Sequence, residues 1–331
     1  MQEHNNRRQI TERERKRAIA YIRRRLILYA VVAGIIVLVL VIALSGRKNK
    51  QSAPETNTQP TSAADTTTQP TTPPGEWQEL TMTKSDMAQG HLILVNADYA
   101  YDPEQAEDLV SVYEDKNDDY YVSSVDLSVS RTIMQSLNNW MEAFYQETGV
   151  NNVEIVAGHR TVEFQQYLRD RALENHGQEH ADNYIALPGH SEHHTGFAVD
   201  LDTYYVETDS LGGFDGTGDY AWVVDNAWRY GFVQRYPLNK KDVTGISYEE
   251  WHFRHVGLPH SKIMYDNNLC LEEYIDYLRQ YPFDGEHLLA SVDDEEFEIY
   301  YCEGYNVTVP KDREYEISGN NVDGFIVTIR N

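Results

Sequence analysis

The sequence predicts an α+β globular domain that follows a membrane-spanning helix and a polar stalk. Three observations support this prediction: an uncharged stretch near the N-terminus, a Thr/Pro/Gln-rich stretch after it, and a long remainder in which helix and strand patterns are interspersed. That remainder lacks the regular β-α-β repeat of a parallel sheet, which favours the α+β class. The chain has 331 residues, 53 acidic and 28 basic side chains, and a formal net charge of -25. This acidity argues against a generally basic nucleic-acid-binding protein.

The first 44 residues predict a cytoplasmic tail and a transmembrane helix. Residues 1–25 contain nine Arg or Lys and three Glu, whereas residues 26–44 (LILYAVVAGIIVLVLVIAL) carry no charge over 19 residues, about the length that spans a bilayer. The basic tail is expected to stay in the cytoplasm, which places the C-terminal bulk of a single-pass protein outside the cell membrane. A cleaved signal peptide is the alternative, but no A-x-A site follows the stretch.

Residues 45–76 predict a disordered stalk, because the Thr/Pro/Gln-rich segment 51–75 has no large apolar side chain to bury. About 255 residues follow, enough for one sizeable core with a small appendage. We assign a globular domain to residues 77–282 and the appendage to residues 283–331. The two cysteines, Cys270 and Cys302, either form a single bridge or are two unrelated buried thiols.

The first half of the domain predicts strands and helices in alternation. His91–Asn96 (HLILVN) has the composition of a short strand, and Val153–Ala157 (VEIVA) of another. The second strand leads through a turn at Arg160 into a helix that begins at Thr161. Apolar residues at helical spacing before Gly149 predict an amphipathic helix between the two strands: Ile133, Leu137, Trp140, Met141 and Phe144.

The second half predicts further strands. In Phe197–Asp202 (FAVDLD) apolar and acidic side chains alternate, so Asp200 and Asp202 lie on the same face of a predicted strand. Two acids on one face of a strand are rare without a functional or structural reason. A helix over residues 221–230, ended by Gly231, precedes strands at residues 232–236 and 251–256. Beyond Tyr281, the segments FEIYY, YNVTV and DGFIVTI predict a small β-meander of three strands. We expect it to pack on the edge of the domain, and contact with substrate is the alternative.

Three potential zinc ligands occur in these patterns. A catalytic zinc site needs three protein donors and one open position, and His193, Asp200 and His252 can supply them. Glu249 lies three residues before His252, where a tight turn would place its carboxylate beside the metal as a general base. A second string, HGQEH at residues 176–180, matches the H-x-x-E-H pattern, but Gly177 and its polar surroundings indicate an exposed loop.

These residues also carry a family resemblance. The pattern S-x-H-x-x-G-x-A-x-D (residues 191–200), followed about fifty residues later by E-x-W-H (residues 249–252), resembles the zinc D-alanyl-D-alanine carboxypeptidases of the VanY type, relatives of Hedgehog-like domains. The upstream GHRT with Gln165 and the segment NAWRYGFVQRYP resemble further motifs of this family in the same order. The resemblance runs from about residue 90 to 282 and covers neither the stalk nor the appendage.

The resemblance implies a Hedgehog/DD-peptidase-like zinc domain and a role for each matching residue. It implies His193, Asp200 and His252 as zinc ligands and Glu249 as general base. A guanidinium at Arg160 suits either a substrate carboxylate or a developing oxyanion, and the remaining matches imply contacts to substrate from Gln165 and Ser191. Four positions depart from the family pattern without removing a ligand or the base: His159, His194, Glu250 and His255.

The resemblance therefore implies a membrane-anchored, extracytoplasmic zinc carboxypeptidase that removes the C-terminal D-alanine from peptidoglycan stem peptides. An L,D-carboxypeptidase acting on tetrapeptide stems is the nearest alternative, since members with that activity share the motifs. A peptidoglycan endopeptidase fits less well, because Arg160 offers a partner for a free terminal carboxylate. A non-catalytic, zinc-stabilised wall-binding module is the alternative of a different class. The expected partners are the stem peptides and the membrane, and no nucleic acid.

Overall fold

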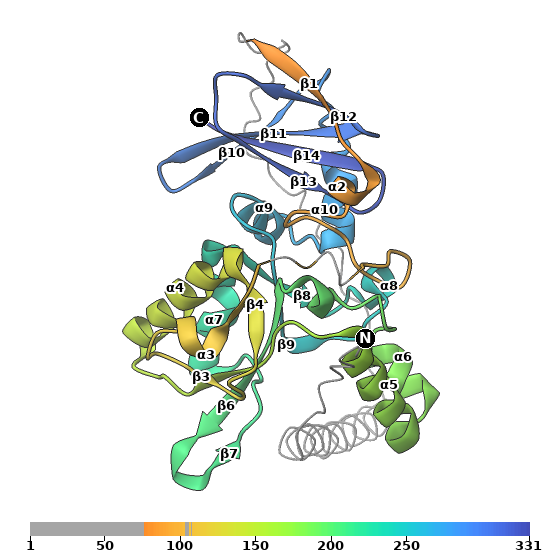
Figure 1. Cartoon of the computed structure of the whole chain (residues 1–331). Coiled ribbons are helices and arrows are strands. Elements are labelled where there is room, and N and C mark those ends of the chain that lie inside the picture. Colours follow the sequence, from red (N-terminus) through yellow and green to blue (C-terminus); the bar gives the residue numbers. More distant parts are fainter. Residues whose placement is uncertain (1–75, 103–105, 107) are drawn as a thin grey trace, which may run out of the picture. The chain divides into compact units, whose positions relative to one another are not determined.

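The computed structural model describes residues 76–102, 106 and 108–331 (Figure 1). The predicted cytoplasmic tail, the transmembrane helix and all of the stalk except residue 76 lie outside the described residues. Within the described ranges, no helix is both long enough and apolar enough to cross a membrane.

A mixed sheet forms the centre of the predicted globular domain. Its strands run in the order β3 (Tyr121–Val122), β5 (Val153–Ala157), β6 (Ala198–Tyr205), β9 (Glu249–His255) and β8 (Phe232–Tyr236), and β7 (Ser210–Leu211) pairs with the far end of β6. The pairs β5–β6, β6–β9 and β8–β9 are antiparallel, whereas β3 runs parallel to β5. This antiparallel centre with helices beside it confirms the α+β prediction.

The long helix α4 (Arg131–Thr148) covers one face of this sheet, as its apolar spacing predicts. Ser130 caps its first turn by accepting from the Thr132 amide, and Gly149 ends it in the left-handed region that glycine adopts at little cost. The ring of Trp140 stacks on Phe232 of β8 and meets Phe253 of β9 edge-on, with ring centroids 4.9 and 5.0 Å apart. The apolar face of α4 thus anchors the strands that carry the candidate site.

Shorter elements surround the sheet. Thr161 caps α5 (Val162–His176) as predicted, and the predicted helix before Gly231 is α7 (Ala221–Asn226) continued by a 3₁₀ turn. The HGQEH string was wrongly predicted as a loop: His176 ends α5 and His180 lies in α6 (Gln178–Tyr184), with Gly177 between the two helices. The remaining short elements of this part are α3 (Val112–Asp115), α8 (Lys241–Thr244) and α9 (His260–Asp266), together with the paired strands β2 (Leu109–Ser111) and β4 (Ser128–Ser130).

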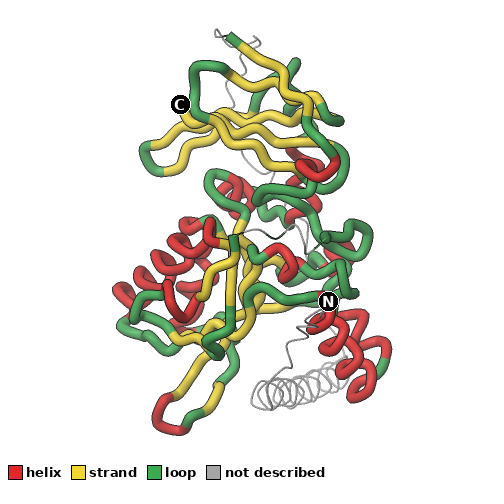
Figure 2. The backbone as a smooth tube through the Cα atoms, in the orientation of Figure 1, coloured by secondary structure: helices red, strands yellow, loops and turns green. Residues whose placement is uncertain are grey.

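The C-terminal part contains more strands than the predicted three. Four strands form one sheet in the order β10 (Leu288–Val292), β11 (Glu295–Glu303), β14 (Gly324–Arg330) and β13 (Tyr315–Gly319). A second, two-stranded sheet pairs β12 (Asn306–Pro310) with β1 (Trp77–Thr81), so residues from both ends of the described chain build this part. Figure 2 shows the region as strands joined by loops, and the short helix α2 (Lys84–Met87) follows β1.

The segment His91–Asn96 is not a strand, contrary to the prediction. Its side chains are as apolar and buried as those of a strand, but its backbone groups bond to side chains and loops instead of to a ladder. The Leu92 amide donates to the Ser318 hydroxyl, and the carbonyls of His91 and Ile93 accept from Arg254. The hydrogen-bond partners of this backbone are residues distant in sequence, and local composition does not reveal them.

One apolar cluster joins the globular part to the C-terminal sheet. It contains Leu92 and Leu94, helix α10 (Leu271–Leu278), and residues of β10, β11 and β14. Cys270 and Cys302 are both buried and both free, so the described chain has two separate thiols.

Candidate active site

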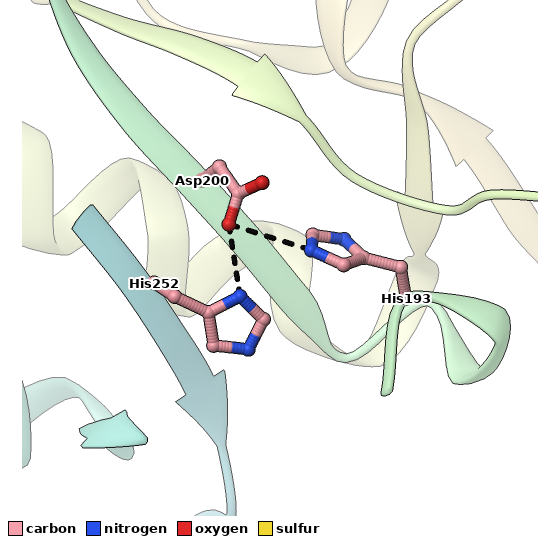
Figure 3. Close-up of side chains that lie close together, drawn as sticks. All are labelled: His193, Asp200 and His252. Carbon is pink, nitrogen blue, oxygen red and sulfur yellow. Dashed lines mark hydrogen bonds and ion pairs between the residues drawn. The ribbon is translucent and has the colours of Figure 1, made fainter. Parts of the chain in front are cut away.

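Three buried side chains converge, two of them from neighbouring strands of the sheet and one from a turn beside it (Figure 3). One ligand atom from each of His193, Asp200 and His252 lies within 4.8 Å of the others. The Asp200 Oδ1 atom lies 2.8 Å from Nδ1 of His252 and 3.4 Å from Nε2 of His193. The structure therefore brings together the three residues whose types and spacing predict a metal site.

Strand register explains why residues so far apart in sequence meet. Asp200 on β6 stands directly opposite His252 on β9 in the antiparallel ladder. His193 lies in the 3₁₀ turn Glu192–Thr195, which ends at Gly196 with a φ of +75°. A Cβ atom at Gly196 would lie 2.9 Å from the Ser130 backbone nitrogen, so both the conformation and the space require glycine.

A β-bulge places Glu249 near His252. Three residues of β9, 250–252, stand opposite the single residue Arg235 of β8. In a regular strand, residues three apart point to opposite faces, and a bulge re-aims side chains of this kind. Glu249 is buried, and its charge contributes to raising the pKa of His252. The structure thus has a bulged strand where the sequence predicts a tight turn, and the role of Glu249 as general base stays a prediction.

Hydrogen bonds behind the histidines determine which ring nitrogens face the centre. Nδ1 of His193 lies 2.7 Å from the Gly158 carbonyl oxygen, so it is the donor and Nε2 is left with its lone pair. Nε2 of His252 lies 3.5 Å from a Glu192 carboxylate oxygen, so Nδ1 faces Asp200. Metal-binding histidines are oriented by such carboxylate and carbonyl partners.

The electrostatics of the site favour a cation. Burial and the nearby Arg160 lower the pKa of His193 to about 4. Burial alone would lower the pKa of His252, but hydrogen bonds to Asp200 and Glu192 outweigh it and raise that pKa to about 9. Burial likewise opposes ionisation of Asp200, yet His193 and Arg160 hold its pKa well below the usual value. The two carboxylates thus stabilise positive charge at His252, in the position where a metal ion would replace a proton.

The donor set fits a catalytic zinc ion. Two imidazole nitrogens and one carboxylate oxygen are ligands that zinc prefers, and three protein ligands leave a fourth position open. Both histidines have the outer partners that zinc-binding histidines require. The described residues His193, Asp200 and His252 are therefore able to hold such an ion.

Of the three predicted substrate-contacting residues, Arg160 contacts this centre directly. The Arg160 guanidinium is 2.5 Å from Oδ2 of Asp200, and its backbone amide donates to the His193 carbonyl. Gln165 is buried and donates through Nε2 to the Ala186 carbonyl, whereas none of the described residues donates a hydrogen bond to its buried Oε1. Ser191 is buried at the start of the 3₁₀ turn. Arg160 thus touches a predicted ligand directly, and Gln165 offers an unpaired acceptor.

Sequence reasoning missed a buried charge network behind the site. Glu192 accepts from Arg235 Nε at 2.7 Å and lies 3.2 Å from Arg254 Nη1. The two guanidiniums outweigh the effect of burial and hold the pKa of Glu192 low, so it is a carboxylate. Glu192 and Arg235 both lie within the quoted motifs, and for Arg235 the available signal was a charged residue inside a predicted strand.

His194 is a second residue that the sequence did not assign. Its ring is fully buried, with Nδ1 2.7 Å from the Arg160 carbonyl and Nε2 accepting from the Gly189 amide at 3.1 Å. Burial lowers the pKa of His194, consistent with a neutral ring that donates at one nitrogen and accepts at the other. His194 therefore links the loop at Gly189 to the turn that carries Arg160.

Known proteins are similar to this chain in sequence. The family model described as "VanY: D-alanyl-D-alanine carboxypeptidase" matches residues 126–258. A D-alanyl-D-alanine carboxypeptidase of Enterococcus faecium is 35% identical over 258 residues, which cover 76% of this chain and 79% of that protein. A bifunctional D-Ala-D-Ala dipeptidase and carboxypeptidase of Enterococcus gallinarum, VanXYC, is 39% identical over 142 residues, covering 42% of this chain and 75% of that one.

A solved structure extends the likeness to the fold. The vancomycin resistance D,D-dipeptidase VanXYg, in complex with a D-Ala-D-Ala phosphinate analogue, is 33% identical, with a TM-score of 0.69. The match covers 78% of this chain and 100% of that one, more than the 126–258 segment alone. The zinc-peptidase-like α+β fold and the family resemblance are thus confirmed, and this chain is an enzyme that belongs to the VanY D-alanyl-D-alanine carboxypeptidase family.

Proposed function

We propose that this protein is a zinc carboxypeptidase that removes the C-terminal D-alanine from peptidoglycan stem peptides. The observation that carries the proposal is the buried convergence of His193, Asp200 and His252, with Glu249 on the same bulged strand as His252. The relatives named for D-Ala-D-Ala carboxypeptidase activity support the choice of substrate.

The proposed mechanism assigns one task to each part of the site. His193, Asp200 and His252 would hold a zinc ion, which when bound would lower the pKa of a water molecule and polarise the scissile carbonyl. Glu249 accepts the proton of the attacking water and then delivers a proton to the leaving D-alanine amine. Burial of Glu249 keeps bulk water from competing for that proton.

Arg160 is proposed to bind the terminal carboxylate of the substrate. Its guanidinium has donors beyond the one that contacts Asp200, and a planar fork suits a carboxylate. The unpaired Oε1 of buried Gln165 suits an amide N–H of the peptide, and Ser191 is proposed as a further contact. A free C-terminus is thus recognised by charge, which favours a carboxypeptidase over an endopeptidase.

Replacing Arg160 by Ala is expected to lower kcat/KM for a stem peptide with a free C-terminus by about 10- to 100-fold, the value of a charge-assisted hydrogen bond. Steady-state kinetics on this peptide and its C-terminal amide give the test. The wild-type enzyme should discriminate strongly between the two, and the variant should not. Equal discrimination by both proteins would show that Arg160 does not read the terminal carboxylate.

Replacing His194 by Ala is expected to raise KM about 10-fold, because the turn at Arg160 loses one hydrogen bond and the Gly189 loop another. His194→Gln should restore a KM close to the wild-type value, since an amide also donates at one atom and accepts at another. The KM values of the three proteins on one peptide provide the comparison. An unchanged KM in the alanine variant would exclude this positioning role.

An L,D-carboxypeptidase remains the second candidate, because the zinc chemistry and the recognition of a terminal carboxylate are the same for either substrate. Defined muropeptides ending in D-Ala-D-Ala or in a single D-Ala distinguish the two when the products are identified by mass. We expect loss of one alanine from the pentapeptide. Cleavage of the tetrapeptide alone would establish L,D specificity, and cleavage of neither by zinc-loaded protein would favour a wall-binding module.

We also propose that residues 26–44 anchor the enzyme in the cell membrane, with residues 1–25 in the cytoplasm and the catalytic domain outside. The uncharged stretch, the basic residues before it and the polar stalk after it support this arrangement. Membrane fractions should retain the protein after an alkaline wash, and protease added to wall-free cells should digest the catalytic domain. Release by the wash would contradict the proposal.

A further inference from the structure

A chain of buried contacts leads from helix α10 to the candidate metal site. Glu272, on α10, accepts two hydrogen bonds from Arg235, from Nη1 to Oε2 at 2.8 Å and from Nη2 to Oε1 at 2.7 Å. The Nε of the same guanidinium donates to Glu192 at 2.7 Å, and the other oxygen of Glu192 faces Nε2 of His252. Four residues from four separate elements thus form one continuous path.

From this path we infer that Glu272 is a positioning residue for the metal ligand His252, acting through Arg235 and Glu192. The inference rests on the proposed zinc site and extends it to a residue outside the 126–258 segment matched by the family. Along this path Glu272 contacts Arg235, and only Glu192 contacts the ligand residue His252.

The geometry of Arg235 couples Glu272 to the position of Glu192, which Arg254 also contacts. The Arg235 side chain is fully buried, and its donors are divided between two carboxylates on two sides. Without Glu272, two donor nitrogens of a buried guanidinium would lose their partners, which costs more than the bonds themselves contribute. Arg235 would then shift toward water or toward Glu192, and the second oxygen of Glu192 would shift with it.

The position of Glu192 matters because it determines which nitrogen of His252 carries the proton. An acceptor at Nε2 keeps Nδ1 free to face Asp200 and a metal ion. Glu272 is itself held by the Asn96 side chain, whose Nδ2 donates to it at 3.2 Å. The irregular segment that ends at Asn96 and helix α10 therefore both support the metal site from behind.

The neighbouring Glu273 provides a matched control. It lies on the same helix, pairs with Lys240 at 2.8 Å and accepts from the Cys270 amide, and neither contact leads to the site. Glu272→Gln removes the charge and half of the fork, whereas Glu272→Asp keeps the charge but withdraws the carboxylate by one methylene. The aspartate variant retains the buried charge balance and so remains informative if the glutamine variant does not fold.

The test is the zinc dissociation constant of the purified full-length protein, measured by competition with a chromophoric chelator at neutral pH. We expect zinc affinity to fall roughly 10-fold in both Glu272 variants, the smallest loss typical when a residue that supports a metal ligand is replaced. In Glu273→Gln we expect zinc affinity to change less than about twofold. Thermal unfolding of the metal-free proteins reports any general loss of stability separately.

The outcomes separate this inference from the proposed function. Wild-type affinity in both Glu272 variants would overturn the positioning role while leaving the proposed function intact. A loss in Glu272→Gln with full affinity in Glu272→Asp would also overturn it, because charge and not position would then matter. Wild-type protein that binds no zinc would overturn the proposed function and this inference together.

Discussion

Replacing Glu249 by Gln is expected to lower kcat by about 10³-fold, within the range that a general base contributes, while zinc binding is retained. The amide is isosteric with the carboxylate but cannot accept the proton of the attacking water. Glu249 is not one of the three convergent ligand residues, so its replacement leaves the donor set complete. Product formation from a pentapeptide stem, measured alongside the zinc content of the same sample, gives both quantities.

Glu250→Gln is the matched control for this experiment. Glu250 is the next residue of the same strand and is partly exposed, so its conversion to an amide is expected to change kcat less than about threefold. Loss of activity in the Glu250 variant, with activity retained in the Glu249 variant, would show that the base had been assigned to the wrong carboxylate. Retained activity in both would favour a reaction without a carboxylate base.

Replacing Asp200 by Asn is expected to weaken zinc binding by more than about 100-fold, beyond the effect of changing an outer-shell partner. Asp200 is a predicted ligand, and it also fixes His252 and Arg160 through its two oxygens. An asparagine amide would place an N–H donor opposite either the His252 ring or the Arg160 guanidinium, where the carboxylate has an acceptor oxygen. Chelator competition should report the lost affinity, and activity at ordinary zinc concentrations should disappear with it.

Asp202→Asn tests whether any buried acid on this strand would have the same effect. Asp202 is two residues further along β6 and is equally buried, but its Oδ1 accepts from the Thr203 and Gly213 amides. Its replacement is expected to lower stability by about 1 to 3 kcal/mol through an imperfectly paired buried group, without a change in zinc affinity. A comparable loss of affinity in this variant would argue against a specific ligand role for Asp200.

The residues of the candidate site were predictable because its chemistry depends on residue types at recognisable spacing. His193, Asp200 and His252 share no element, yet the ladder register of β6 and β9 brings two of them together and Gly196 directs the third. The two acids of β6 illustrate the limit of such reasoning. Asp200 belongs to the convergent group, whereas Asp202 accepts hydrogen bonds from two backbone amides.

The features that sequence reasoning did not predict depend on contacts between distant segments. Strand β1 pairs with β12 across more than two hundred residues, and no local pattern indicates such a partner. The segment at Leu92 has strand composition, but its backbone finds partners in Ser318 and Arg254. The hydrogen bond from Arg235 to Glu272 likewise joins two elements, and no pattern in their sequences indicates that they lie together.

Zinc titration of the metal-depleted enzyme tests the central claim most directly. The purified protein is stripped with a chelator, zinc is returned in steps, and the release of D-alanine from a pentapeptide stem is measured at each step. We predict that activity is absent in the stripped protein, rises in proportion to bound zinc, and saturates at one ion per chain. Full activity without metal, or saturable zinc binding that restores no cleavage, would contradict a zinc carboxypeptidase built on His193, Asp200 and His252.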